Sequence, residues 1–293
     1  MLTCTIGITA YNEEANIGTL LKRLQQQHLA PVIIHEIVVV ASGCTDGTEA
    51  IVQVMAEDDP RIRLLSQPQR EGKASAINLF LRETTDDLLI LSSADLLPAI
   101  DAVENLIAPF SDERIGIAGS HPVPVDKPDN FMGYGVNLLW NLHHDIYMNG
   151  GVNVGEMIAF RRLFEMIDVE TAVDEASIEQ LIRAQGYQVQ YVAAAIVYNK
   201  GADSIPDFIR QRRRIHAGHL EMTQTLGYSV STMDGGTILK ALLLRQSWRP
   251  VPLVWTVGIV ALEIYGRFLG WLDHKQNRSH TVWEIAESTK QLG

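Results

Sequence analysis

The chain has 293 residues, of which 46% are hydrophobic and 20% charged, a composition that can bury a sizeable core in one large domain or in one domain with an appendage. Its formal net charge of −11 argues against a nucleic-acid partner, because a phosphate backbone repels an acidic surface. The two cysteines have no metal-ligand spacing, which favours a reducing compartment. The N-terminus is expected to be a strand, because it lacks the basic start and the long apolar run of a signal peptide, and this favours the cytoplasm.

Apolar runs and helical repeats alternate through the first third of the chain. Asn12 is expected to cap the first helix, whose apolar positions recur at helical spacing. Strands alternating with helices favour a parallel sheet covered on both faces, with ligands bound beyond the carboxyl ends of its strands. The strands are expected at residues 3–10, 36–41, 61–66 and 88–92, and further helices at 48–55 and 72–82.

The second half has a less regular pattern. An edge strand is expected at residues 115–119, followed by a loop rich in proline and aspartate at 121–130. The remaining expected elements are helices at 131–148, 177–185 and 205–226, and strands at 155–160, 188–192 and 195–198.

The stretch DDLLILSSADLLP (residues 86–98) places Asp95 at the tip of a buried strand. The sequence has no GxGxxG or GxxxxGK[ST] phosphate loop, so a bound diphosphate would need a metal or basic side chains. Magnesium typically takes one or two carboxylates together with phosphate oxygens and waters, and Asp95 can supply one such ligand. The alternative is that Asp95 only caps a turn before Pro98.

The chain resembles the inverting glycosyltransferase family 2, which has the GT-A fold. The resemblance covers roughly residues 3–220 and is carried by segments in the family's order: ITAYNEEANIGTLL, VVVASGCTDGT, EGKASAIN, LLILSSADLLP, GEMIAFRR, DEASIEQLIRAQGY and QRRRI. It implies a mostly parallel sheet flanked by helices, with a Rossmann-like half that binds the nucleotide sugar (residues 1–98) and an acceptor half (residues 99–235).

The resemblance also implies the residues around the nucleotide. Tyr11 and Glu13 would lie near the base and ribose, although Glu13 could instead serve only the positive end of a helix. Asp46 matches an aspartate behind the nucleoside, and could equally hold its loop by capping the helix that begins near Thr48. Lys73 would approach the phosphates or the nucleoside, unless it is a solvated lysine at a helix start.

Two departures from the family pattern affect the nucleotide and metal positions. Acids that usually end the second strand are replaced by Ala41 and Ser42, which leaves the identity of the base open. The usual acid-x-acid motif reads Ser93, Ala94, Asp95, so one carboxylate is a hydroxyl. Ser42 and Ala94 are still expected beside the nucleotide, and Asp95 is expected to hold Mg²⁺ or Mn²⁺.

An inverting transfer needs a base that takes a proton from the acceptor hydroxyl as it attacks the anomeric carbon. The family supplies an aspartate from a Glu-Asp pair at a fixed distance before a Gly-Tyr. At that distance before Gly186 this chain has Asp174-Glu175, with the acids in reverse order. Glu175 is favoured as the base and Asp174 stays the alternative; an acidic start that only complements a helix dipole is also open.

QRRRI occupies the place of the family's Gln-x-x-Arg-Trp. By this match Arg214 would assist the departing nucleoside diphosphate, because a cation stabilises the charge that develops there, and Gln211 would lie beside it. Ile215 replaces the tryptophan associated with processive synthases, which points to addition of a single sugar.

The composition changes at the C-terminal region, residues 236–293. Residues 237–272 are mostly apolar, but Glu263 and Arg267 form a possible ion pair that makes a spanning helix the least favoured of three options. Aromatics beside apolar helices favour peripheral membrane attachment, ahead of a homodimer interface. The aromatics are Trp248, Trp255 and Trp271.

The sequence therefore predicts a metal-assisted, inverting hexosyltransferase. It would move one sugar from a nucleotide-diphosphate donor to the hydroxyl of an unidentified acceptor, such as a lipid-linked or polysaccharide precursor, in the cytoplasm or at the cytoplasmic face of the membrane. The alternative is a catalytically degenerate GT-A protein that acts as a membrane- or partner-binding subunit, because three family acids are missing.

Overall fold

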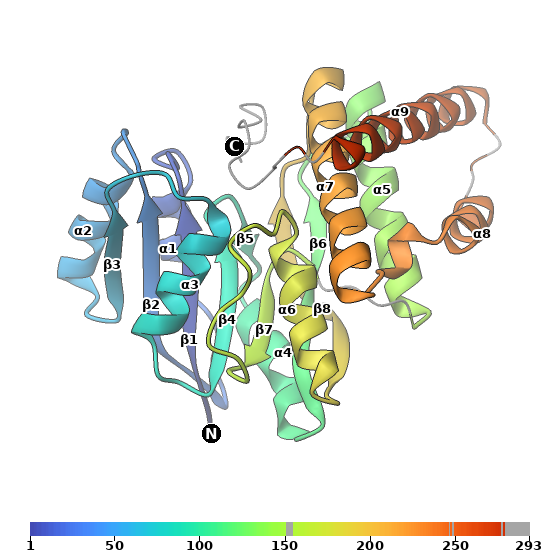
Figure 1. Cartoon of the computed structure of the whole chain (residues 1–293). Coiled ribbons are helices and arrows are strands. Elements are labelled where there is room, and N and C mark those ends of the chain that lie inside the picture. Colours follow the sequence, from blue (N-terminus) through green and yellow to red (C-terminus); the bar gives the residue numbers. More distant parts are fainter. Residues whose placement is uncertain (151–154, 246, 248, 277, 279–293) are drawn as a thin grey trace.

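The computed structural model describes residues 1–150, 155–245, 247, 249–276 and 278, whose arrangement is shown in Figure 1. Trp248 and residues 279–293 of the expected C-terminal region therefore lie outside the described residues. The strands form one eight-stranded sheet of order β3-β2-β1-β4-β7-β6-β8-β5. They are β1 (Leu2–Ala10), β2 (Val32–Ser42), β3 (Ile62–Gln67), β4 (Leu88–Ser93), β5 (Leu97–Pro98), β6 (Ile115–Pro124), β7 (Ile158–Arg161) and β8 (Gln188–Asn199).

Helices cover both faces of this sheet, because its central strands are apolar on both sides. One core lies between the sheet and α1, α2 and α4, and a second lies between the opposite face and α3 and α6. In Figure 1, α5, α7 and α9 lie together beyond the β6–β8 side of the sheet. The helices are α1 (Ile17–Gln25), α2 (Thr48–Asp58), α3 (Lys73–Glu83), α4 (Ala102–Ile107), α5 (Phe131–Met148), α6 (Asp174–Ala184), α7 (Ile205–Leu226), α8 (Gly235–Arg245) and α9 (Pro250–Lys275), with short 3₁₀ turns η1 (Ala108–Ser111) and η2 (Ser231–Met233).

The expected parallel sheet is confirmed for β1 to β4, while β7 runs antiparallel to both of its neighbours, β4 and β6. The expectation of an edge strand at residues 115–119 was wrong, because β6 lies between β7 and β8. The two strands expected at 188–192 and 195–198 form the single strand β8. Its parallel pairing with β6 resumes after an irregularity between Gly119 and His121, and the strand does not end at Ala193 and Ala194 as expected.

Asn12 does not cap the first helix as expected. Helix α1 begins at Ile17 with Asn16 at its N-cap position, and Asn12 has a φ of +52°, a left-handed conformation that asparagine tolerates better than most residues. The Oδ1 atom of Asn12 accepts a hydrogen bond from the backbone N–H of Thr45 at 2.8 Å. Asn12 thus joins the loop after β1 to the loop after β2, and both loops lie at the carboxyl edge of the sheet.

Gly43 permits a close approach between two loops at this edge. It has a φ of +67°, and a Cβ atom at this position would lie 2.4 Å from the backbone nitrogen of Arg70. A Gly43→Ala substitution is therefore expected to lower the free energy of unfolding by about 2 kcal/mol or more, as measured by chemical denaturation.

Gly186→Ala is the matched control for this prediction. Gly186 has a φ of +88°, but among the described residues no atom lies within 4 Å of the position that a Cβ atom would take there. Its substitution therefore introduces backbone strain without a clash. Equal destabilisation by the two substitutions would show that the contact with Arg70 does not constrain the loop.

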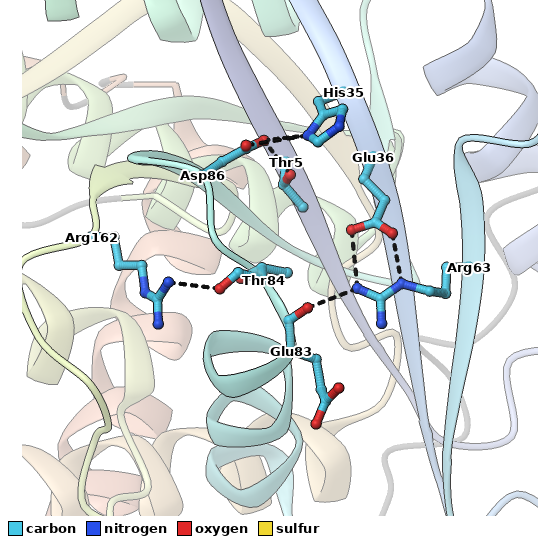
Figure 2. A network of polar contacts seen from close by, with 8 residues as sticks. All are labelled: Thr5, His35, Glu36, Arg63, Glu83, Thr84, Asp86 and Arg162. Carbon is cyan, nitrogen blue, oxygen red and sulfur yellow. Dashed lines mark hydrogen bonds and ion pairs between the residues drawn. The ribbon is translucent and has the colours of Figure 1, made fainter.

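The amino edge of the sheet, opposite Asp95, is braced by polar contacts (Figure 2). Asp86 accepts a hydrogen bond from Thr5 Oγ1 at 2.6 Å and lies 3.0 Å from Nδ1 of His35. Arg63 pairs through two nitrogens with both carboxylate oxygens of Glu36, at 2.6 and 3.0 Å. These contacts join β1, β2, β3 and the start of β4, and so hold the strands that carry the carboxyl edge. Further contacts drawn there are those of Arg63 with Glu83 and of Arg162 with Thr84.

Candidate active site

A cavity of about 740 Å³ opens at the carboxyl edge of the sheet. The ends of β1, β2, β4 and β8 supply one part of its wall, and the start of α3, the start of α6 and the first half of α7 supply another. The sequence-predicted residues in its lining are Tyr11, Glu13, Ser42, Lys73, Ala94, Asp95, Asp174, Glu175, Gln211 and Arg214. The structure thus brings together side chains that lie up to two hundred positions apart in the sequence.

The first turns of α3 and α6 meet in this cavity. Lys73, the first residue of α3, places its Nζ 2.6 Å from Oε1 of Glu175 and 3.5 Å from Oδ2 of Asp174. The side chain of Glu175 is 25% exposed and that of Asp174 only 3%. Glu175 is therefore the acid of the pair that incoming groups can reach.

Burial and the Lys73 ammonium act in opposite directions on the two acids. Burial is the largest single effect on Glu175 and would raise its pKa, but the charge of Lys73, the hydrogen bonds to the carboxylate and the charge of Arg214 together outweigh it and lower the pKa. For Asp174 burial prevails over Lys73 and raises the pKa to about 6. Glu175 is thus a carboxylate at neutral pH, as a base must be, and Lys73 is held charged beside it.

Arg214 adds a second cation to this group. It lies on α7, whose N-cap residue Ser204 accepts a hydrogen bond from the backbone N–H of Asp207 at 3.3 Å. Burial lowers the pKa of Arg214 from its usual value, and the nearby charges of Asp174 and Glu175 oppose that effect. An arginine retains its charge under these conditions, so the cavity contains a half-buried, charged guanidinium near both acids.

The neighbouring arginines of the QRRRI run have different partners. Arg213 forms an ion pair with Asp273 of α9, and Nε of Arg212 lies 3.9 Å from Oε2 of Glu263, also on α9. Glu263 also accepts a hydrogen bond from Arg267 at 2.8 Å. The run therefore serves two purposes, because Arg214 faces the acids of α6 while Arg212 and Arg213 attach α9 to α7.

Tyr11 and Glu13 line the side of the cavity formed by the loop after β1. The guanidinium of Arg70 lies 4.2 Å from the centre of the Tyr11 ring, in the range of a cation–π contact. Glu13 is 9% exposed, and its carboxylate accepts a hydrogen bond from Asn16 at 3.0 Å. Ser42 Oγ accepts a hydrogen bond from the backbone N–H of Glu71 at 3.3 Å, which holds the Arg70 loop against β2.

Asp46 lies behind this wall and is not among the described residues that line the cavity. Its carboxylate accepts hydrogen bonds from the backbone N–H of Glu14 at 3.1 Å and from Thr48 Oγ1 at 2.6 Å. These bonds hold the loop after β2 at the start of α2, which is the loop-holding alternative that the sequence left open for Asp46.

Two cavity residues that sequence reasoning missed lie beside Asp95. Glu156 stands two residues before the start of β7, and its Oε2 accepts a hydrogen bond from Nδ2 of Asn199 at 2.8 Å. Burial, followed by the charge of Asp95, raises the pKa of Glu156 to about 8. The available signal was the carboxylate of GEMIAF directly ahead of an apolar strand, and Asn199 ends the apolar strand β8 in the same way.

Asp95 is the carboxylate best placed to hold a divalent cation. It lines the cavity at the tip of β4, and its charge acts on Glu156 and Arg214. Among the described residues no three His, Cys, Asp or Glu side chains are grouped so that they could hold a metal by themselves. A site with Asp95 as its main protein ligand fits a magnesium-type ion, which takes one or two carboxylates and completes its coordination shell with phosphate oxygens and water.

Comparisons with known proteins identify relatives of this chain. The family description "Glycosyl transferase family 2" matches residues 5–165. A dolichyl-phosphate beta-glucosyltransferase of Trichomonas vaginalis is 26% identical over 220 residues, which cover 68% of this chain and 65% of that protein. A bactoprenol glucosyl transferase of Shigella phage SfX is 33% identical over 104 residues, 35% of this chain and 34% of that protein. The chain thus matches less than two thirds of the length of these relatives.

Solved structures share the fold. The mannosyltransferase PcManGT from Pyrobaculum calidifontis, solved with GDP-Man and Mn²⁺, superposes with a TM-score of 0.63 at 20% identity, covering 94% of this chain and 88% of that one. Glucosyl-3-phosphoglycerate synthase from Mycobacterium tuberculosis, solved with Mn²⁺, UDP and phosphoglyceric acid, gives a TM-score of 0.53 at 20% identity over 75% of this chain and 78% of that one. These likenesses confirm the GT-A fold, and with a family match over more than half of its length the chain belongs to glycosyl transferase family 2.

Proposed function

We propose that the protein is a hexosyltransferase that moves a single sugar, with inversion, from a nucleotide-diphosphate sugar to an acceptor oxygen. The observation that carries this proposal is the convergence of Lys73, Asp95, Glu175 and Arg214 in one cavity. Two cations that can face a diphosphate and a carboxylate that can take a proton are the groups that such a transfer needs. Membership of glycosyl transferase family 2 supports the same reaction class.

In the proposed mechanism Glu175 is the base. Its carboxylate is ionised, and its side chain is more exposed to the cavity than that of Asp174. An acceptor O–H group, of an alcohol or of a singly protonated phosphate, gives its proton to Glu175 as its oxygen bonds to the anomeric carbon from the face opposite the diphosphate, while the bond between that carbon and the diphosphate oxygen breaks. Asp174 keeps Lys73 and Arg214 in place from its buried position.

Lys73 and Arg214 stabilise the nucleoside diphosphate as it leaves. Negative charge accumulates on the diphosphate oxygen that separates from the anomeric carbon, and both cations are partly shielded from water. A bound diphosphate also gives Lys73 a second anionic partner, which loosens its hold on Glu175 and makes that carboxylate more basic. Asp95 would hold Mg²⁺ or Mn²⁺, which supplies Lewis-acid stabilisation of the diphosphate when bound. The metal found with PcManGT supports this assignment.

The proposal is tested with a panel of nucleotide sugars that varies both base and sugar. The protein is incubated with each donor and with Mg²⁺ or Mn²⁺, and both thermal stabilisation and release of nucleoside diphosphate are measured. A metal-dependent response to at least one donor is expected. Absence of any response across the panel would contradict the proposed function.

The acceptor that the comparisons favour is a membrane lipid of the polyprenyl class. The relatives are named for dolichyl phosphate and bactoprenol. Such an acceptor stays in the bilayer, so the enzyme has to bring its cavity to the membrane surface. α9 borders that cavity through Glu263 and Arg267.

The outer face of α8 and α9 has the character of a membrane-binding surface. In α9 the exposed apolar side chains recur at helical spacing, and α8 adds more of them. Among residues 235–245, 247 and 249–276 the acids are Glu263 and Asp273, and both pair with arginines on the inner side. We call this surface the α8–α9 apolar face; it comprises Leu239, Leu243, Leu244, Val251, Val254, Val257, Ile264, Tyr265, Phe268 and Trp271.

The charge around this face suits an anionic lipid surface. Lys240, Arg249 and Lys275 are exposed along α8 and α9, in a chain whose net charge is −11. Lys275 Nζ also lies 4.1 Å from the ring centre of Trp271.

Among the described residues α9 is the one helix long and apolar enough to cross a membrane. Its inner face is packed on α7 and carries ion pairs, so we propose that it lies in the interface.

A Val254→Glu, Ile264→Glu double variant is expected to bind anionic liposomes at least about tenfold more weakly, because each of these side chains contributes about 1.5–3 kcal/mol when buried in lipid. Val54→Glu is the matched control, since Val54 is 61% exposed on the distant helix α2 and Val254 is 68% exposed. Co-sedimentation measures the binding. Equal binding by wild type and double variant would contradict a membrane role. If wild type and Val54→Glu were dimers and the double variant a monomer, the α8–α9 apolar face would be assigned to contact with a second copy of the chain.

A further inference from the structure

We propose that Glu156, held by Asn199, forms the subsite that binds hydroxyl groups of the transferred hexose and thereby selects the sugar. This inference rests on the proposed function. It assigns a role to a pair of residues that neither the sequence motifs nor the catalytic scheme uses. The ligand class is the pyranose ring of a nucleotide-linked hexose.

Strand pairing determines where these two residues lie. Ile158 of β7 pairs with Leu91 of β4, so Glu156 stands level with the carboxyl end of β4 at Ser93. Asn199 ends β8, where it pairs with Pro124 of β6. Antiparallel β7 therefore begins at the edge where β4 and β8 end, and the subsite is fixed by the sheet itself.

Glu156 is near both the diphosphate end and the base end of the proposed reaction. The carboxylates that act on it electrostatically are Asp95 and, more weakly, Glu175, and Lys73 acts on it as well. The hexose is joined to the diphosphate, which the metal at Asp95 would hold, and its anomeric carbon has to face the acceptor oxygen that Glu175 deprotonates. The ring must therefore lie between these two groups, where Glu156 forms part of the cavity wall.

The Glu156–Asn199 pair also has the hydrogen-bonding capacity that a sugar requires. One oxygen of Glu156 is occupied by Asn199 Nδ2, which fixes the orientation of the carboxyl group. Asn199 is 4% exposed, and among the described residues its Oδ1 has no hydrogen-bond partner. Buried polar atoms without partners are costly, and sugar hydroxyls both donate and accept hydrogen bonds. A bound hexose would bring such hydroxyl groups to this pair.

The test separates binding of the sugar from binding of the nucleotide. The donor that wild type uses, for example UDP-glucose or GDP-mannose, is compared with the corresponding UDP or GDP in the presence of Mn²⁺. For Glu156→Ala we expect about 10- to 100-fold weaker binding of the nucleotide sugar and less than about twofold change for the diphosphate, because one or two hydrogen bonds to the sugar are lost. Glu156→Gln is expected to keep part of the affinity and to reduce discrimination between epimers, such as UDP-glucose and UDP-galactose.

Glu179→Ala is the control for removing a buried glutamate. Glu179 is 0% exposed, bonds Tyr228, and is not among the described residues that line the cavity. Its substitution should leave both affinities unchanged in the folded protein. If Glu156→Ala lost equal affinity for the nucleotide sugar and for the diphosphate, or lost affinity for neither, the proposed subsite would be overturned. If wild type itself bound the diphosphate but processed no nucleotide sugar, the proposed function would fail instead.

Discussion

Replacing Glu175 with glutamine is expected to reduce kcat by about 10²- to 10⁴-fold, the usual contribution of a positioned general base. The amide cannot take the acceptor proton, but it retains the size of the side chain. Lys73 keeps Asp174 as a partner at 3.5 Å, so donor binding should change far less than turnover. Rapid-quench measurement of product formation at saturating donor, together with donor affinity, separates the two effects.

The control for this prediction is Asp174→Asn, which addresses the alternative that the sequence left open. Asp174 is buried, so its substitution is expected to lower stability and donor affinity more than Glu175→Gln does. Thermal melting shows whether each variant is folded. A Glu175→Gln enzyme with nearly full turnover, combined with a folded but inactive Asp174→Asn enzyme, would transfer the role of base to Asp174.

Replacing Asp95 with alanine is expected to lower kcat/KM by about 10³-fold or more and to remove the metal dependence of donor binding. Lewis-acid stabilisation of a diphosphate contributes several kcal/mol, and Asp95 is the protein carboxylate assigned to the metal. Isothermal titration of the nucleoside diphosphate with and without Mn²⁺ measures the effect. Because few protein groups are available to the ion, metal affinity in the absence of nucleotide should be low even in wild type.

Ser93→Ala and Ser93→Asp are the matched variants at the other end of the acid-x-acid motif. The hydroxyl of Ser93 is not assigned to the metal, so alanine should be nearly neutral. Aspartate restores the carboxylate that family members usually have, and it should strengthen metal binding in the absence of nucleotide. Full activity of Asp95→Ala, with metal dependence intact, would contradict the metal assignment.

The sequence predicted the sheet and its carboxyl edge well for physical reasons. Buried strands such as β1 and β4 are apolar on both faces, and helices α5 (Phe131–Met148) and α7 (Ile205–Leu226) begin and end at the residues expected from their pattern. The errors came where tertiary contacts override local pattern. Asn12 bonds Thr45 instead of capping a helix, and β8 continues through Ala193 and Ala194 because β6 pairs with it on both sides of them.

The active-site geometry was only partly predictable. The motifs located Lys73, Asp95 and Glu175 separately, but the 2.6 Å contact between Lys73 and Glu175 joins residues 102 positions apart and depends on how α3 and α6 pack. The one local signal for Glu156, its position ahead of an apolar strand, does not distinguish it from a solvated glutamate. Its pKa and its bond to Asn199 follow from sheet topology, which a single sequence does not specify.

The central claim is that one cavity couples release of a nucleoside diphosphate to transfer of one sugar with inversion. The most direct measurement supplies the donor selected from the panel, labelled in its sugar, to the protein with Mn²⁺ and a polyprenyl phosphate in anionic liposomes. Diphosphate release and sugar transferred to the lipid are quantified, and NMR determines the anomeric configuration of the product. We expect one sugar per diphosphate, with a configuration opposite to that in the donor. Product with the donor's configuration, or diphosphate release without sugar on the lipid, would contradict this claim.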